Sequence, residues 1–341
     1  MNTPNEKQNV YYTSQEKEDK QYYYSLVSSI GKEIQKVIFG QKEMLQSILC
    51  TLLSRGHILL EGVPGLAKSL AVSTFSRVIG GEFQRIQFTP DKLPGDITGT
   101  TIYNEASGEF EFYHGPVFCN LLLADEINRA SPKVQSALLE SMQEKRVSIE
   151  RRNFPLPELF MVLASQNPVE QMGTYPLSEA QLDRFMVKYD ISYPAPADEA
   201  ELLKKKSTDF EKDVKSVIQI TSPEEVVKMQ ELVANSVVIT EPVIKYIQSI
   251  CLQTRKTEDS DPESNNGHIL VGISPRGAEH LIYYCKSFAF VQGRDYVNFN
   301  DVDQCAPLVL SHRLVLNESA LMEGVREKFI INKIISKTSP W

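Results

Sequence analysis

The sequence predicts an α/β domain built on a parallel β-sheet, followed by an all-helical domain. Short apolar runs alternate with helical patterns in the first part of the chain, an order typical of a parallel sheet covered on both faces. The expected strands lie at 57–60, 83–88, 120–124, 160–165 and 186–191. Two prolines within 193–196 predict a hinge, and beyond them only amphipathic helical patterns remain.

The expected division is a polar tail at 1–20, the α/β domain at 21–193 and the helical domain at 194–341. Helical periodicity from Tyr22 onward predicts two helices before the first strand, joined by an apolar-glycine segment that contains Gly40. The helices expected in the second domain span 198–206, 223–234, 241–255, 275–291 and 301–313. The acidic stretch at 256–267 is expected to be an exposed loop.

Composition narrows the class of protein. The 341 residues are 42% hydrophobic and 23% charged, which is enough to bury a sizeable core. A net charge of -8 makes nucleic acid an unexpected main partner, because duplex binders usually present a basic face. Five cysteines without a C-x-x-C spacing predict free thiols in a reducing cytoplasm, not disulfides or zinc. Neither a secretory signal nor an integral membrane segment is expected.

The strongest motif is a glycine-rich loop between the first strand and a helix. It consists of Gly62, Val63, Pro64, Gly65, Leu66, Ala67, Lys68 and Ser69. The pattern G-x-x-x-x-G-K-[ST] of a P-loop fits, except that alanine replaces the second glycine. In such a loop, backbone N–H groups and the helix N-terminus bind phosphates, Lys68 contacts the β- and γ-phosphates, and the Ser69 hydroxyl binds Mg²⁺. The alternative is an ordinary turn followed by a chance Lys-Ser pair.

Two carboxylates end the expected strand at 120–124. Asp125 would hold Mg²⁺, and Glu126 would polarise the attacking water as a general base. At the carboxyl edge of a parallel sheet they would lie beside the P-loop. The alternative is an exposed acidic strand end. The position of the pair after the P-loop favours the catalytic interpretation.

Three further polar residues are weaker signals. Asn167 ends the strand at 160–165 and could orient water, although Asn-Pro is also a turn former. Arg184 could reach the nucleotide of a neighbouring subunit, or could simply pair with Asp183 on the surface. Arg276 follows Ser-Pro at a helix start and could reach the γ-phosphate, or could be a solvated residue near a cap.

In this order, the motifs resemble a MoxR-type AAA+ ATPase. The segments that carry the resemblance are EGVPGLAKS at 61–69, LLLADEINRA at 121–130, QSALLESMQEKRVSI at 135–149, ASQNP at 164–168, EAQLDRF at 179–185 and SPRG at 274–277. The resemblance extends over residues 37–277. The GLAK sequence matches the family's own P-loop, so Ala67 supports the resemblance.

The resemblance implies a five-stranded parallel sheet with a helical lid, inserts at 95–116 and 147–156, and an ATP- and Mg²⁺-dependent hexameric ring. It implies that Gly40 lines the adenine pocket and that Arg129 acts across the subunit interface. Family members are thought to be chaperone-like remodelling ATPases whose protein clients often carry a von Willebrand factor A domain and mature or acquire metal.

Two other functions stay open. A nucleic-acid motor or a magnesium-chelatase-like subunit would use the basic pairs at 145–146 and 151–152, which are otherwise a solvated face, and salt-dependent DNA binding would distinguish it. A non-catalytic nucleotide switch would have lost its catalytic residues, yet Lys68, Ser69, Asp125 and Glu126 are all present.

Overall fold

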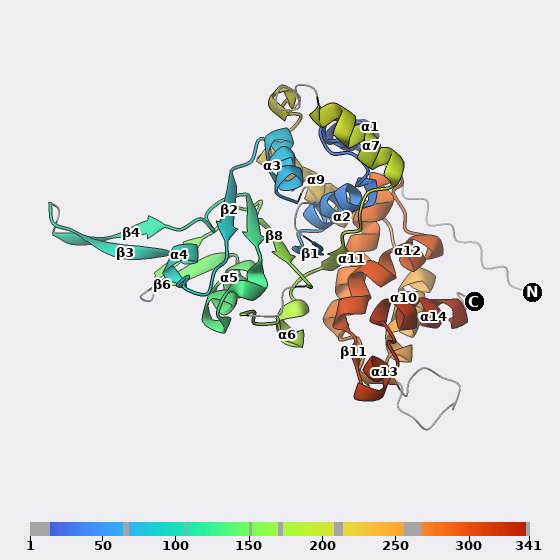
Figure 1. Cartoon of the computed structure of the whole chain (residues 1–341). Helices are drawn as coiled ribbons and strands as arrows, with labels where there is room; N and C mark the ends of the chain where they lie inside the picture. The colour runs from blue at the N-terminus through green and yellow to red at the C-terminus, as the bar shows by residue number, and fades with distance from the viewer. Residues whose placement is uncertain are drawn as a thin grey trace, which may run out of the picture.

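The chain folds into a sheet-containing part and a bundle of helices that pack against each other (Figure 1). The computed structural model describes residues 14–63, 68–106, 108–149, 152–169, 173–207, 214–255 and 268–338. A long hairpin, formed by β3 Gly99–Asn104 and β4 Glu109–His114, projects from the sheet-containing part on the side away from the helical bundle (Figure 1).

Five parallel strands form the central sheet in the order β2-β5-β8-β1-β9. Their bounds are β1 Ile58–Glu61, β2 Phe83–Gln87, β5 Leu121–Asp125, β8 Met161–Gln166 and β9 Val187–Asp190. The parallel five-stranded sheet and all five expected strands are therefore confirmed. Because β5, β8 and β1 are neighbours, the segments that follow them open at one edge of the sheet.

Both faces of the sheet are buried, which explains why its strands read as apolar runs. Alternate residues point to opposite faces. Leu60, Leu123 and Leu163 belong to one apolar cluster, which includes α2 and α3, whereas Leu59 and Leu122 belong to a second cluster with α5. The bounds of these helices are α2 Lys42–Leu53, α3 Lys68–Ile79 and α5 Pro132–Glu144. The short helices α4 Gly95–Thr98, η1 Ile127–Arg129 and α6 Glu179–Leu182 complete this part.

The first helix, α1 Ser14–Gln35, begins inside the stretch that was expected to be a polar tail. Its apolar face, with Ile30 and Ile34, is buried in the first cluster. The Lys20 ammonium forms an ion pair at 3.1 Å with Asp295 of the helical bundle. The helix thus extends further toward the N-terminus than its apolar periodicity predicted, because its polar first turns also have a charged partner.

The helical bundle contains the five predicted helices and, beyond residue 313, two helices that were not predicted, α13 Glu318–Met322 and α14 Glu327–Lys337. The predicted helices are α7 Pro196–Lys206, α9 Pro223–Ser236, α10 Glu241–Gln253, α11 Pro275–Val291 and α12 Phe299–Leu310, which continues into η3 Ser311–Arg313. One small antiparallel ladder, β10 Ile269–Val271 with β11 Val315–Leu316, was not predicted, since two or three residues carry no alternation pattern. The acidic loop at 256–267 lies outside the described residues.

The bundle packs directly on α2 of the sheet-containing part. The Gln230 side chain donates a hydrogen bond of 2.6 Å to the Leu52 carbonyl, and the Ser54 and Ser287 hydroxyls lie 2.7 Å apart. The first apolar cluster continues without a break from the sheet into α10, α11 and α12. These contacts fix the position of the helical bundle, which corresponds to the expected lid, relative to the sheet.

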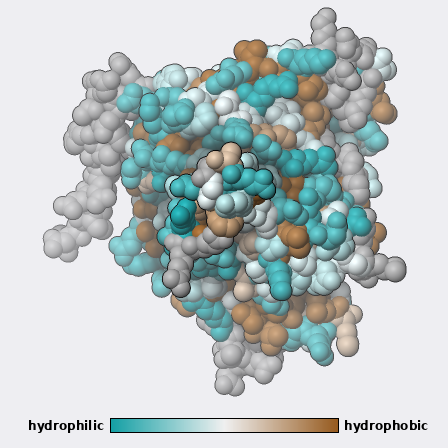
Figure 2. Space-filling view, turned by 90° about the vertical axis from the view of Figure 1, so that its left-hand side faces the viewer, coloured by the Kyte–Doolittle hydropathy of each residue, from teal (hydrophilic) through white to brown (hydrophobic). Residues whose placement is uncertain are grey.

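Two hairpins occupy the positions of the expected inserts. They are β3 Gly99–Asn104 with β4 Glu109–His114, and β6 Arg146–Ile149 with β7 Arg152–Pro155. The rings of Phe112 and Phe154 lie 4.1 Å apart, and His114 stacks on Phe118 at 4.1 Å, so an aromatic cluster joins the hairpins. Figure 2 views the face from which β3–β4 projects, where hydrophilic side chains surround smaller hydrophobic patches.

Candidate active site

The predicted phosphate-binding loop lies between the end of β1 and the start of α3. Gly62 packs so closely on Ile191 that an added Cβ would lie 3.0 Å from the Ile191 Cβ and 3.2 Å from its carbonyl oxygen. Lys68 opens α3, and its ammonium donates a hydrogen bond of 2.9 Å to the Gly62 carbonyl. Pro64, Gly65, Leu66 and Ala67 lie outside the described residues.

Lys68 lies close to the acidic end of β5. Burial lowers the pKa of its ammonium, and the negative charges of Asp125 and Glu126 oppose that shift. Ser69 follows in the first turn of α3 and is half-buried. A lysine, a hydroxyl and two carboxylates are therefore brought to the carboxyl edge of the sheet, as the sequence predicted. Mg²⁺ bound together with phosphates uses few protein oxygens, so Ser69 and Asp125 fit as its ligands.

Asp125 is held by two side chains that sequence reasoning missed. The buried Ser165 hydroxyl donates a hydrogen bond of 2.5 Å to Asp125 Oδ1, and Arg85 of β2 pairs with Oδ2 at 2.7 Å. The Ser165 hydroxyl also accepts a bond of 3.0 Å from the Glu126 backbone N–H. Ser165 therefore orients both acidic residues. Asp125 Oδ2 faces the guanidinium of Arg85, which is a cation, as Mg²⁺ would be.

Replacing Ser165 with alanine should lower the free energy of unfolding by about 1–3 kcal/mol, because two buried polar groups lose their partner. It should also lower kcat, since Asp125 and Glu126 are no longer oriented. Urea denaturation and ATP turnover measure the two effects. Ser141→Ala is the matched control, because this buried hydroxyl donates to the Ala137 carbonyl of its own helix. Equal stability losses in the two variants would contradict the assigned role.

Glu126 has a left-handed backbone, with φ 58° and ψ 51°, immediately after β5. Its Oε2 accepts hydrogen bonds from the Gln87 amide at 2.7 Å and from Arg129 at 3.3 Å. Arg129 thus contacts Glu126 of the same chain, where the resemblance implied action across an interface. Both contacts engage the same carboxylate oxygen, Oε2.

Asn167 is buried directly after β8. Its side-chain oxygen accepts a hydrogen bond of 3.1 Å from the Val169 N–H. This contact is the one that the turn-forming interpretation expects. Because the oxygen is engaged, the NH₂ group is the part of this side chain that can contact a nucleotide or water.

Gly40 lies where the first two helices meet the start of the bundle. Its φ of +68° favours glycine, and a Cβ there would come within 2.6 Å of Asp198 Cβ in α7. The adjacent Gln41 amide donates to the Ser192 carbonyl at 3.2 Å. The chain on both sides of the expected hinge is thus in contact with the Gly40 segment.

Arg184 and Arg276 lie together at the opposite edge of the sheet from the P-loop. Arg184 comes just before β9, and the Met186 N–H donates to the His57 carbonyl at the start of β1. Both arginines line one cavity with Arg55, His57 and Lys145. Because β1 alone is about 13 Å long, Arg276 lies far from the P-loop of its own chain, whereas a lid residue was expected to lie near the γ-phosphate. Lid docking on Asp183 is the physical reason.

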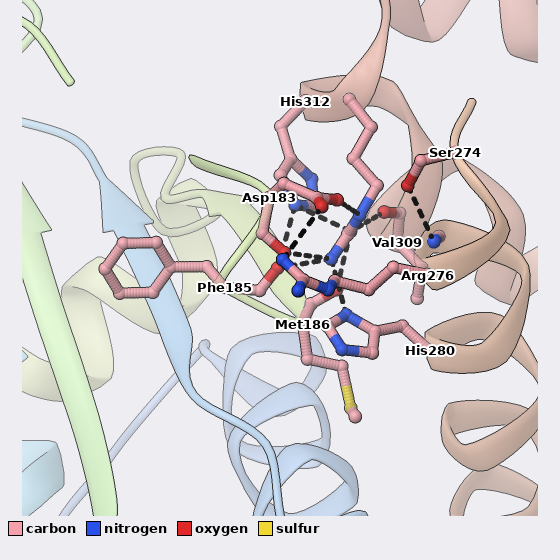
Figure 3. A network of polar contacts seen from close by, with 10 residues as sticks. Asp183, Phe185, Met186, Ser274, Arg276, His280, Val309 and His312 are labelled. Carbon is pink, nitrogen blue, oxygen red and sulfur yellow. Dashed lines mark hydrogen bonds and ion pairs between the residues drawn. The ribbon is translucent and has the colours of Figure 1, made fainter. Parts of the chain in front are cut away.

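Asp183 does not pair with its neighbour Arg184, contrary to the surface-pair alternative. Its Oδ1 accepts from Arg313 at 2.7 Å, and its Oδ2 pairs with Arg276 at 3.3 Å (Figure 3). The bundle thereby supplies both partners. Arg184 lines the cavity described above. The charged side chains of that cavity are arginines and a lysine, so it suits an anionic ligand.

The comparisons with known proteins agree with this layout. The profile of the ATPase family associated with various cellular activities (AAA) matches residues 57–187, and the AAA lid domain profile matches residues 264–334. Chaperone MoxR1 of Mycobacterium tuberculosis is 46% identical over 303 residues, covering 89% of this chain and 79% of that protein. The chain belongs to the MoxR family of AAA+ ATPases.

Two further relatives support the assignment to the MoxR family. Protein MoxR of Paracoccus denitrificans is 30% identical over 293 residues, which cover 82% of this chain and 86% of that protein. The crystal structure of a proposed ATPase from Cytophaga hutchinsonii superposes with a TM-score of 0.88 at 44% identity, covering 95% and 98% of the two chains. No helix within the described ranges of this MoxR-family protein is long and apolar enough to cross a membrane.

Proposed function

We propose that this MoxR-family protein hydrolyses ATP to ADP and phosphate in a Mg²⁺-dependent reaction. Lys68 and the P-loop backbone from Gly62 to Ser69 bind the phosphates, and Gly40 lies at the adenine. Ser69 and Asp125 hold Mg²⁺, which neutralises phosphate charge when bound. Glu126 withdraws a proton from the attacking water, and the Asn167 NH₂ group helps to orient that water.

The observation that carries this proposal is the grouping of Lys68, at the start of α3, with Asp125 and Glu126, at the carboxyl end of β5. Glu126 is within hydrogen-bond reach of Gln87 and Arg129, which hold its carboxylate before ATP binds. A carboxylate that is held beside a phosphate site, and can be released, is the element that water activation needs.

ATP turnover by the purified protein tests the assignment. We expect phosphate release with Mg²⁺, none with EDTA, and a loss of ATP binding in Lys68→Ala. Lys245→Ala is the matched control, because this lysine is exposed on α10 and pairs only with Glu241 in its own helix. Phosphate release that persists in EDTA or in Lys68→Ala would refute the proposed site.

We further propose that Arg184 and Arg276 act on the nucleotide of a neighbouring subunit in a homo-oligomeric ring, which the family resemblance suggests is hexameric. Their place at the edge of the sheet opposite the P-loop supports action in trans. A guanidinium from a neighbour stabilises the negative charge of the transition state and typically contributes about 10³–10⁵ in kcat.

The proposed client is a protein, and the von Willebrand factor A domain and the metal-maturation role are proposals from the family. The charge of the β3–β4 hairpin supports a protein over nucleic acid. Glu105, Glu109 and Glu111 lie on it, and no lysine or arginine occurs between residues 93 and 128. Tyr103 and Phe110 are exposed near its end, where they could contact an extended polypeptide.

A nucleic-acid motor or a magnesium-chelatase-like subunit remains the second candidate. The β6–β7 hairpin favours it, because Arg146 and Arg152 are exposed there. The acidic β3–β4 hairpin packs against the β6–β7 hairpin through Phe112 and Phe154, so a strand of nucleic acid would meet both negative and positive side chains.

The five buried, unpaired cysteines support the proposed cytoplasmic location.

A further inference from the structure

Arg313 is the last residue of η3 and contacts residues that Figure 3 labels, among them Asp183, Phe185 and His280. Only 2% of its side chain is exposed, which is unusual for arginine. Neither the P-loop chemistry nor the proposed trans arginines make use of it. A buried guanidinium is costly unless most of its donors are satisfied, so the contacts of Arg313 identify its role.

The guanidinium of Arg313 binds the backbone on both sides of Arg184. It donates to the carbonyl oxygens of Asp183 at 3.1 Å, Phe185 at 2.7 Å and Met186 at 3.2 Å, and also to that of Val309. Its Nε donates to the Asp183 carboxylate at 2.7 Å. Five donors in a planar fork can hold several carbonyls at once, which a lysine ammonium cannot do in the same geometry.

Two histidines complete the cage around Arg313. Its Nη2 lies 2.5 Å from His280 Nδ1, and its Nη1 lies 2.8 Å from His312 Nε2. Burial and the charge of Arg313 lower the pKa of His280 to about 3, and the same causes lower the pKa of His312. Both imidazoles are therefore neutral near pH 7, and the Asp183 carboxylate is the anion that Arg313 and Arg276 share.

The start of α11 is shaped around this side chain. An added Cβ at Gly277 would lie 3.0 Å from Arg313 Cδ and 2.6 Å from Ile273 Cγ2. Gly277 thus lets Arg313 pass the helix that carries Arg276. The lid bonds to the Arg184 segment in two places, through Arg313 and through Arg276.

We infer that Arg313 is a positioning residue that fixes Arg184 and Arg276 for hydrolysis at the neighbouring subunit, an inference that rests on the proposed action of Arg184 in trans. Arg313 acts by clamping the backbone at 183–186 to the lid. Any lid movement that accompanies nucleotide exchange in one subunit is thereby passed to the arginines that serve the next. The lid of one subunit therefore sets the hydrolysis rate of its neighbour.

The test is Arg313→Lys, which keeps the charge and loses the fork. We expect kcat to fall about 10- to 100-fold, as for a catalytic group misplaced by about 1 Å, while the KM for ATP and assembly stay near wild type. Arg294→Lys is the matched control, because Arg294 makes an equivalent lid ion pair with Asp301 at 2.6 Å and should keep full activity. If Arg313→Lys fails to fold, Asp183→Asn replaces it, with the same expected loss of kcat.

Mixing separates positioning in trans from a structural defect. Arg313→Lys subunits retain their own catalytic residues, and Glu126→Gln subunits retain correctly placed arginines, so mixed rings should recover activity that neither variant has alone. Full activity of Arg313→Lys alone would overturn the inference. The inference would also be overturned if mixing Arg313→Lys with Glu126→Gln restored no activity while mixing Arg184→Ala with Glu126→Gln did. Full activity of Arg184→Ala would instead show that the proposed function in trans is wrong.

Discussion

Glu126→Gln is expected to lower kcat for ATP hydrolysis by about 10²–10⁴, the usual contribution of a general base. Glutamine has nearly the same shape as glutamate and can still contact Gln87 and Arg129, but it cannot accept a proton from water. ATP binding should remain, because Lys68 and Asp125 are unchanged. Single-turnover phosphate release measures the chemical step, and titration with a fluorescent ATP analogue measures binding.

The matched control for this prediction is Glu241→Gln. Glu241 is exposed on α10 and pairs with Lys245 in the same helix, so its loss should leave turnover unchanged. Wild-type turnover in Glu126→Gln would contradict the assignment of the base. The alternative of a non-catalytic nucleotide switch would then gain support, because such a protein does not need Glu126.

Arg184→Ala is expected to lower kcat by about 10³–10⁵, the range measured for arginines supplied in trans. Asp183 is already bound by Arg313 and Arg276, so Arg184 is not needed to neutralise it. The variant should therefore fold, bind ATP and assemble like the wild type. Steady-state kinetics with a binding titration would show a loss in kcat with little change in affinity.

Arg326→Ala provides the comparison for a loss of positive charge alone. Arg326 is exposed at the start of α14, away from the arginine cavity, and its loss should not change kcat. Arg184 does not act in trans if Arg184→Ala hydrolyses ATP as fast as Arg326→Ala.

The carboxyl edge of the sheet could be predicted because its signals are local. Each of β1, β5 and β8 is a buried apolar run that ends in polar residues, so the motif and its structural context coincide in the sequence. Ser165 was missed because its role depends on register. Ala124 pairs with Ala164, which brings the next residues, Asp125 and Ser165, side by side. That pairing follows only once the strand order is known.

The position of Arg276 could not be predicted from local signals. A serine cap and a proline correctly predicted the start of α11, and Ser274 does accept from the Gly277 N–H. The position of that helix start depends on Asp183 and Arg313. Asp183 comes 91 positions before Ser274 in the sequence, and Arg313 comes 39 positions after it. Contacts between such distant residues leave no periodic pattern, so the lid arginine was expected at the wrong edge of the sheet.

The central claim is that a neighbouring subunit completes each active site. Specific ATPase activity measured against protein concentration, with molar mass from light scattering in the presence of ATP, tests it most directly. We predict that activity per subunit rises as rings assemble, and that Arg184→Ala assembles over the same concentrations without gaining activity. Constant specific activity in a monomer, with Arg184 dispensable, would contradict the claim.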